Sequence, residues 1–399
     1  MNSYHYSERP IGIYVHIPFC YSKCGYCDFY SLTDLSQKKL VEYIDSLEAE
    51  IDLIAETYGS LEVQSIYLGG GTPSILNLEC IENIWESLNT KYRINEDAEI
   101  TMEANPDSID LKYLREIRKI GINRLSIGVQ SLIDEELKLL DRRHDSTQAI
   151  KAVREAREAG FGNLSIDVMF GLPSQEIETA VSNVIEAEAL GVDHLSLYGL
   201  IPEPGTPMRE QFERGELPFP SGGDYAEMYL QSSAFLTGKG FRRYEISNFA
   251  RKGFECRHNL NYWNYGSYLG FGPSAHSALI SCEKGEYRVK RFWNYKDLDR
   301  YVRRMKKNTT AVEDTEELDS DKIALERLLL RLRMEEGYRF ASDDEYYRFM
   351  SFDDMKSRID NLCDKRMLVL EPGKAIRCTD VGFVYADEII AGISSSLNT

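Results

Sequence analysis

Short apolar runs rich in β-branched residues recur along the first half of the chain and alternate with amphipathic stretches. Six runs have the length of buried strands: residues 12–17, 63–68, 98–102, 124–129, 164–169 and 194–200. Between them, apolar residues recur at helical spacing over residues 36–58, 110–119, 146–159 and 177–190. Ser146 is expected to cap the third of these helices, and Gly121 and Gly160 follow the ends of the second and third.

This alternation predicts the class of fold. Strands and helices that follow one another at a repeat of about 30 residues form right-handed βαβ crossovers and a parallel sheet. A complete TIM barrel has eight such units, whereas six are recognisable here. The sequence therefore predicts an α/β protein built on a partial (β/α)6 TIM-like barrel, with its chemistry where the carboxyl ends of the strands meet.

The pattern changes after residue 200. Residues 201–207 predict a loop, residues 241–249 are compatible with a further strand, and residues 256–277, rich in Asn, Gly and Tyr, predict another loop. Further along, residues 318–388 predict two or three charged helices, with a hairpin near residues 368–377.

Three domains are expected from these changes. The partial barrel would cover residues 1–240 and an extension residues 241–300. A small, mainly helical domain of winged-helix type would cover residues 301–399.

The composition predicts a cytoplasmic protein. Hydrophobic residues make up 43% and charged residues 28% of the 399 positions, as in ordinary globular proteins. The formal net charge of −18 argues against nucleic acid as a partner. No apolar run approaches the roughly 18 residues that span a bilayer, and the start, MNSYHYSERP, lacks the apolar core of a signal peptide. Peripheral membrane contact stays open.

Three of the eight cysteines lie close together, directly after the first strand. Cys20, Cys24 and Cys27 have the spacing C-x3-C-x2-C. A cuboidal iron–sulfur cluster takes one thiolate per iron, so three thiolates leave one iron open for the amino and carboxylate groups of S-adenosylmethionine (SAM). Two alternatives remain: structural zinc with His16 as fourth ligand, and redox use of Cys24 and Cys27.

Polar or glycine features follow the other expected strands. They are Gly69-Gly70-Gly71-Thr72-Pro73, Glu103, Gln130, Asp167 and Tyr198, after or on strands two to six. Alone, the glycine triplet is equally well explained by a tight turn. A carboxylate such as Glu103 suits an amino or hydroxyl group, and Arg142 suits a carboxylate, although Arg142 could instead lie at a solvated helix end beside Arg143.

Several segments carry a resemblance to a known family. YVHIPFC, GGGTPS, NRLSIGVQS, residues 141–144 (DRRH) and SIDVMFGLP together resemble the oxygen-independent coproporphyrinogen oxidase family of radical SAM proteins, over nearly the whole chain. The resemblance implies a [4Fe-4S] cluster on the three cysteines. It also implies SAM contacts at Tyr14, Tyr26, Gly70, Gly71, Thr72, Glu103, Gln130, Arg142 and Asp167.

The family has an oxidase branch, which decarboxylates coproporphyrinogen III, and a haem-chaperone branch. Three features favour the chaperone branch. Phe29 stands where the oxidase motif has a fourth cysteine, and the cysteine motif begins within 20 residues of Met1, without the long N-terminal extension of the oxidases. Residues 258–263, HNLNYW, match the HNxxYW haem-binding motif. The oxidase, and a radical enzyme acting on another substrate, remain as alternatives.

The resemblance implies haem and a haem-acceptor protein as partners. Imidazole is a good axial ligand for haem iron, which makes His258 the candidate, and Tyr262 and Trp263 offer flat apolar surface. A purely structural His258 remains an alternative, while Cys256 and His276 are weaker candidate ligands.

One basic stretch stands out against the acidic chain. Residues 288–307 contain nine basic and two acidic residues, with aromatic residues interleaved. Such a stretch could receive haem propionates or an acidic partner. RNA binding over stacked aromatics, or a solvated helix face above core aromatics, would give the same pattern.

Overall fold

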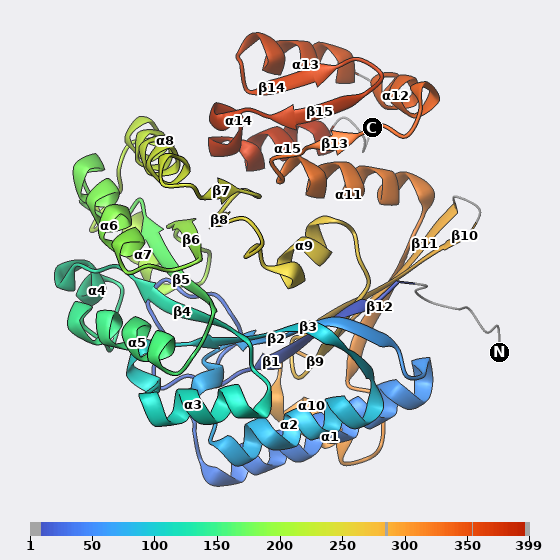
Figure 1. Ribbon diagram of the computed structural model, residues 1–399. Helices are drawn as coiled ribbons and strands as arrows, with labels where there is room; N and C mark the ends of the chain where they lie inside the picture. The colour runs from blue at the N-terminus through green and yellow to red at the C-terminus, as the bar shows by residue number, and fades with distance from the viewer. Residues whose placement is uncertain (1–8, 284–285, 353, 396–399) are drawn as a thin grey trace.

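The computed structural model describes residues 9–283, 286–352 and 354–395. Six parallel strands in sequential order form the centre of one large sheet (Figure 1). They are β1 (Ile11–Ile17), β2 (Glu62–Gly70), β3 (Arg93–Ala104), β4 (Arg124–Gln130), β5 (Asn163–Phe170) and β6 (His194–Gly199). The predicted partial barrel is thereby confirmed. The polar N-terminus considered above, residues 1–8, lies outside the described residues.

Helices follow the strands and cover the outside of the sheet (Figure 1). They are α1 (Gln37–Tyr58), α2 (Leu78–Lys91), α3 (Leu111–Ile120), α4 (Asp134–Leu139), α5 (Ser146–Glu158), α6 (Ile177–Ala189), α7 (Pro207–Glu213) and α8 (Gly222–Gly238), with short 3-10 turns at Pro73–Ile75 and Pro106–Ser108. The expectation that Ser146 caps α5 is wrong. Asp145 caps it, because its carboxylate accepts the Gln148 backbone N–H while the Gln148 side chain accepts the Asp145 N–H.

The strands are buried on both faces, as parallel strands usually are. Along β1 only Tyr14 is less than fully buried. Ile13, Val15 and Ile17 belong to a single apolar core with Leu47 of α1. This core holds the carboxyl ends of the strands in a fixed arrangement.

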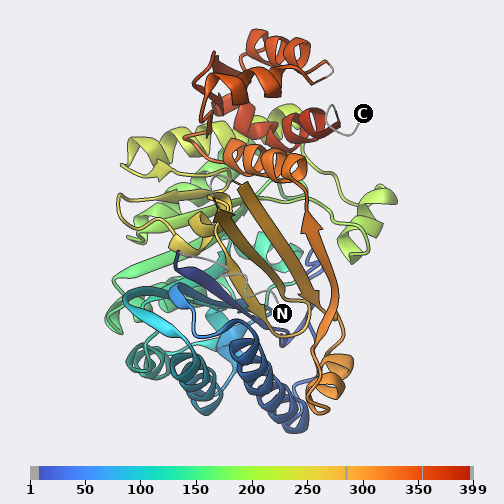
Figure 2. The ribbon, with the colours of Figure 1, turned by 90° about the vertical axis from the view of Figure 1, so that its right-hand side faces the viewer.

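The sheet continues beyond the six barrel strands on both sides. On the β6 edge lie β7 (Arg242–Arg243) and β8 (Asn248–Ala250), so residues 241–249 contribute two short strands where one was expected. On the β1 edge lie β9 (Tyr268–Phe271), β10 (His276–Glu283), β11 (Glu286–Asn294) and β12 (Val312–Leu318), and this side of the sheet faces the viewer in Figure 2. Within the described residues the sheet runs unbroken to β12. The domain limits expected at residues 240 and 300 remain a prediction.

The expectation of a loop over residues 256–277 is wrong. This segment contains a short helix, α9 (Arg257–Trp263), and β9, which pairs in parallel with β1. Its glycines allow close backbone packing. A Cβ atom on Gly270 would lie 2.1 Å from the carbonyl oxygen of His276. Glycine content signalled a loop in the sequence, whereas here it permits a tightly packed strand.

A smaller domain follows the large sheet and lies away from α1 to α3 (Figure 1). Its elements are α11 (Ser320–Leu332), β13 (Tyr338–Arg339), α12 (Asp343–Met350), α13 (Met355–Asp364), β14 (Leu368–Glu371), β15 (Ala375–Cys378), α14 (Asp380–Val384) and α15 (Ala386–Ser395). The expected hairpin is confirmed as β14–β15. Among its described residues the domain has five helices where two or three were expected, because some are too short to show a helical apolar pattern, such as α14 with 5 residues.

A buried carboxyl group joins the extension to the barrel. Glu50 of α1 accepts hydrogen bonds from the Gly272 backbone N–H at 2.8 Å, the Asn294 side chain at 2.5 Å and the Tyr301 hydroxyl at 2.7 Å. Tyr301 belongs to α10 (Leu298–Met305), which packs on α1. Burial raises the pKa of Glu50 to about 7, although its three donors oppose the shift.

Within the described residues, no helix has the length and apolar character needed to cross a membrane.

Candidate functional site

The three clustered cysteines lie in the loop between β1 and α1. The loop closes on itself, because the Cys20 backbone N–H donates to the Leu32 carbonyl at 2.9 Å and Leu32 donates to Pro18 at 2.6 Å. All three thiols are free and half-buried. The fold thus presents them together at the barrel mouth.

Two side chains from other loops contact these thiols, Thr72 after β2 and Arg142 after α4. The Thr72 hydroxyl donates to the Cys20 sulfur at 3.5 Å, and the Arg142 guanidinium donates to the Cys24 sulfur at 3.6 Å. Burial raises the pKa of the Cys20 and Cys27 thiols, so binding of iron there releases protons. Donors directed at sulfur suit thiolate ligands.

A mononuclear metal site is less well supported. Both ring nitrogens of His16 are hydrogen-bonded, Nδ1 to the Tyr14 hydroxyl at 3.0 Å and Nε2 to the Tyr30 carbonyl at 2.9 Å. Over the described ranges, no three His, Cys, Asp or Glu side chains are grouped as ligands of one metal ion. Three free thiols in one loop suit a multi-iron cluster, which takes one thiolate per iron.

The glycine triplet after β2 packs against the cysteine loop. Gly70 has a φ of +108°, and a Cβ on it would lie 2.5 Å from the His16 ring. The backbone N–H groups of Gly71 and Thr72 donate to Ile17 and Phe19, at 2.8 and 2.7 Å. The triplet is therefore required for close approach of two loops, whatever else it binds.

Glu103 of β3 lies beside this triplet. Its carboxylate accepts hydrogen bonds from the Tyr67 hydroxyl at 2.8 Å and from the Gly70 backbone N–H at 3.2 Å. Burial raises the pKa of Glu103 to about 7. Burial also raises the pKa of Asp167 on β5, which accepts a hydrogen bond from Ser126 at 3.3 Å.

Arg142 does not lie at a solvated helix end. Its guanidinium donates to the Asn105 side chain at 2.6 Å and to the Gly128 carbonyl at 2.9 Å, in addition to Cys24. Its neighbour Arg143 is the exposed one and pairs with Asp107. The solvated interpretation is therefore wrong for Arg142.

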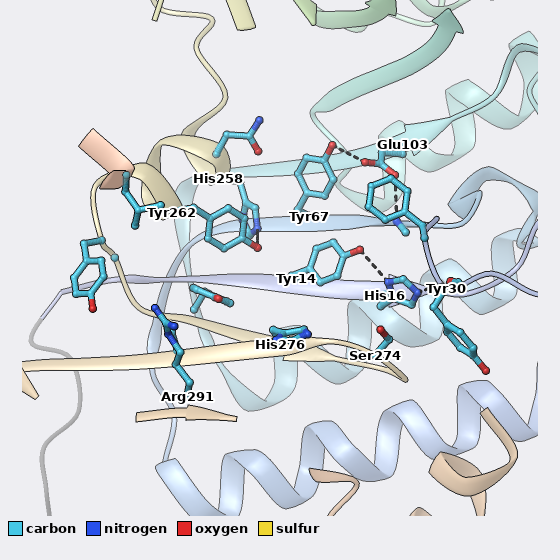
Figure 3. A pocket seen from close by; sticks show the side chains of 18 of the residues that line it. Tyr14, His16, Tyr30, Tyr67, Glu103, His258, Tyr262, Ser274, His276 and Arg291 are labelled. Carbon is cyan, nitrogen blue, oxygen red and sulfur yellow. Dashed lines mark hydrogen bonds between the residues drawn. The ribbon is translucent and has the colours of Figure 1, made fainter. Parts of the chain in front are cut away.

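A cavity of about 660 Å³ opens at the barrel mouth and is lined by β1, β2, α9 and β10 (Figure 3). It brings together five of the predicted SAM and haem contacts, Tyr14, Gly70, Glu103, His258 and Tyr262, and it is also lined by Tyr198 and His276. Cys24, Thr72 and Arg142 line a small recess of about 20 Å³ instead. Neither of these two hollows is lined by the remaining predicted contacts, which are Tyr26, Gly71, Gln130, Asp167 and Trp263.

His258 is almost fully buried at 1% exposure. Its Nδ1 is hydrogen-bonded to Ser65 at 2.9 Å and its Nε2 to the Tyr262 hydroxyl at 2.8 Å. Burial, with a smaller contribution from Arg124, lowers the pKa of His258 to about 3, so the ring is neutral. Ligation of iron by His258 would require one of these hydrogen bonds to break.

Two other residues of this segment, Cys256 and Trp263, do not line the cavity. The Cys256 thiol is buried, lies 3.4 Å from the Glu99 carboxylate, and has its pKa raised to about 12 by burial. Trp263 lies under the Arg333 guanidinium, 5.9 Å from the ring centre, and its Nε1 has no hydrogen-bond partner among the described residues.

Tyr30 and Tyr67 of the cavity wall were not identified from the sequence, whereas Arg291 and Lys296 belong to the basic stretch considered as a receiver of haem propionates. Tyr67 is the register partner of Tyr14, and their rings stack at 6.3 Å. Tyr14 and Tyr67 stand at matching positions of two expected strands that follow one another, and this pairing could have identified Tyr67 as a residue of the cavity wall. Tyr30 lies three residues after Cys27, in the same loop between β1 and α1. In the basic stretch, Phe292 and Tyr301 are core residues, as expected for a solvated helix face above core aromatics, but within this described stretch only Leu298–Met305 is helical and the residues up to Asn294 belong to β11.

Comparison with known proteins agrees with this geometry. The family model for the Radical SAM superfamily matches residues 14–183. The solved structure of coproporphyrinogen III oxidase (HemN) from Escherichia coli superposes with a TM-score of 0.83 at 25% identity, covering 98% of this chain and 91% of that one. Fold and cysteine loop thus define a radical SAM protein, a class that implies SAM and a [4Fe-4S] cluster.

Sequence identity to individual relatives shows which family within this class the chain belongs to. The protein named heme chaperone HemW from Bacillus subtilis (strain 168) is 34% identical over 390 residues, which cover 96% of this chain and 99% of that protein. The protein of the same name from Mycobacterium tuberculosis (strain ATCC 25618 / H37Rv) is 36% identical over 335 residues, 84% of each chain. The chain belongs to the HemW family.

Proposed function

We propose that this protein is a haem chaperone, which binds haem in the cavity at the barrel mouth and passes it to an acceptor protein. The observation that carries the proposal is the cavity itself. It joins the HNLNYW helix to the mouth of a radical SAM barrel. Relatives that carry the name heme chaperone HemW support the same function.

The chemistry of the cavity wall suits a porphyrin. Haem combines a flat apolar ring, a metal and two carboxylates. The wall offers aromatic rings, among them Tyr14, Tyr67 and Tyr262, together with basic groups. A volume of about 660 Å³ lies within the range of about 300–1,000 Å³ typical of cofactor sites. Within the motif, His258 and Tyr262 line the cavity, while Trp263 does not line it and lies under Arg333.

We propose that Cys20, Cys24 and Cys27 hold the [4Fe-4S] cluster. The SAM contacts would be Tyr14, Tyr26, Gly70, Gly71, Thr72, Glu103, Gln130, Arg142 and Asp167. Reduced clusters of this class supply an electron that cleaves a carbon–sulfur bond of SAM. The residues of this chain contribute donors to the thiols from Thr72 and Arg142, and a buried carboxyl group at Glu103.

The second candidate function is oxidative decarboxylation of coproporphyrinogen III. The likeness to the HemN structure, at a TM-score of 0.83, favours it. Phe29 argues against it, because this side chain is 65% exposed at the cavity edge where the oxidase motif would place a cysteine. The haem acceptor and a cytoplasmic location belong to the chaperone proposal.

One assay separates the two functions. The protein is reconstituted with iron and sulfide under anaerobic conditions and incubated with coproporphyrinogen III, SAM and a reductant, with authentic oxidase as the positive control. A chaperone leaves the substrate unchanged. Release of carbon dioxide and protoporphyrinogen would overturn the chaperone proposal.

A further inference from the structure

Three histidines line the cavity, and they differ in what their ring nitrogens contact. Both nitrogens of His16 and both of His258 are hydrogen-bonded to neighbouring groups of the protein. His276, at the start of β10, is exposed, and its ring makes no hydrogen bond to any described residue. Figure 3 shows its ring on the cavity side of β10, between Ser274 and Arg291.

The position of the His276 ring is fixed by packing. It stacks on Trp293, with ring centres 5.8 Å apart and an interplanar angle of 22°, and Trp293 is its register partner on β11. The close approach of Gly270 fixes the backbone at the same point. A ring held by packing alone keeps its nitrogens available to a ligand.

The ring also has the protonation state that a metal requires. Partial burial, with a smaller contribution from Arg291, lowers the pKa of His276 below its usual value. The imidazole is therefore neutral at pH 7 and has a lone pair to donate.

Lys296 provides a charge for the carboxylates of a porphyrin. It lines the cavity, is exposed, and forms no ion pair with any residue that the structure describes. Arg291, the other strong cation on the wall, is already paired with Glu326. An incoming carboxylate therefore finds Lys296 without a competing partner.

We infer that His276 is an axial ligand of the iron of a metalloporphyrin in this cavity, and that Lys296 contacts one of its propionates. The inference rests on the proposed function. It makes His258 a positioning residue: its hydrogen bond to Ser65 ties α9 to β2, and its hydrogen bond to Tyr262 orients that ring within α9.

The test compares two porphyrins that differ only in the metal. Haem and metal-free protoporphyrin IX are titrated into the wild-type protein and the variants His276→Ala and Lys296→Ala, with circular dichroism to check folding. We expect His276→Ala to weaken haem binding at least about tenfold and to shift the haem absorption band, because a coordinate bond is lost. Its affinity for protoporphyrin IX should equal that of wild type. Lys296→Ala should weaken both porphyrins.

A chemical rescue completes the test. Free imidazole added to His276→Ala should restore the wild-type absorption spectrum of bound haem, which a purely structural role would not allow. An equal loss for both porphyrins, or an unchanged haem spectrum in the variant, would overturn the inference while leaving haem binding intact. A wild-type protein that binds neither porphyrin would contradict the proposed function itself, and the inference with it.

Discussion

At the scale of single residues, the site depends on a few polar groups that the fold removes from water. The Cys24 sulfur accepts a hydrogen bond from Arg142, and the Glu103 carboxylate accepts one from Tyr67. Arg142 lies between α4 and α5, and Tyr67 lies on β2, so each group is held by a neighbour that is distant in the sequence.

Replacing one cysteine of the triplet should abolish the cluster. In Cys24→Ser, one iron loses its thiolate, and we expect the anaerobically reconstituted variant to lose most of its bound iron and its broad visible absorption. Cys80→Ser is the matched control, because Cys80 lies on α2, outside the cysteine loop. Iron content in Cys24→Ser equal to that of the control would show that the cluster lies elsewhere.

Glu103→Gln should weaken SAM binding by about tenfold, because a carboxylate binds the SAM amino group more strongly than an amide does. The pKa of Glu103 is about 7, so the carboxylate is mostly protonated below that value and charged above it. SAM affinity of the wild type should therefore rise from about pH 6 to about pH 8, and the variant should be flat. Equilibrium binding to the reconstituted protein measures both. Identical pH profiles would exclude this contact.

At the scale of elements, α9 and the strands β9 to β12 complete the cavity. They supply His258, His276 and Arg291, whereas the barrel strands supply Tyr14 and Glu103. Glu50 ties these two parts together, because its donors come from the β9–β10 turn, β11 and α10. Replacing the Glu50 side chain should therefore change the free energy of unfolding.

Glu50→Gln should lower the free energy of unfolding by about 1–3 kcal/mol at about pH 5, because the new amide NH₂ faces a donor. The folded-state pKa of Glu50, about 7, lies above its ordinary value. The stabilisation from its proton is therefore full below the unfolded pKa and is lost as the pH rises through 7. The variant should lack this part of the pH dependence.

Urea unfolding at about pH 5 and about pH 8 measures both effects. Glu56→Gln, an exposed position on the same helix, is the control. If Glu50→Gln and wild type showed the same pH dependence of stability, the proton responsible for that dependence would not be bound by Glu50.

At the scale of the whole molecule, the sequence predicted the barrel better than the extension. Six strands were recognisable because parallel strands are long apolar runs, and the cysteine spacing marked the mouth. The segment that carries α9 and β9 was mistaken for a loop because its glycines serve close packing. His276 and Lys296 were not connected with Glu103, since only the folded sheet brings them to one cavity.

A haem chaperone must bind haem and then release it chemically intact. The most direct measurement is an anaerobic haem titration of the reconstituted protein, followed by addition of apomyoglobin as a haem sink. We predict saturable binding of one haem per chain and transfer of intact haem to apomyoglobin. Binding that does not saturate, or haem that is altered or never released, would contradict a chaperone role.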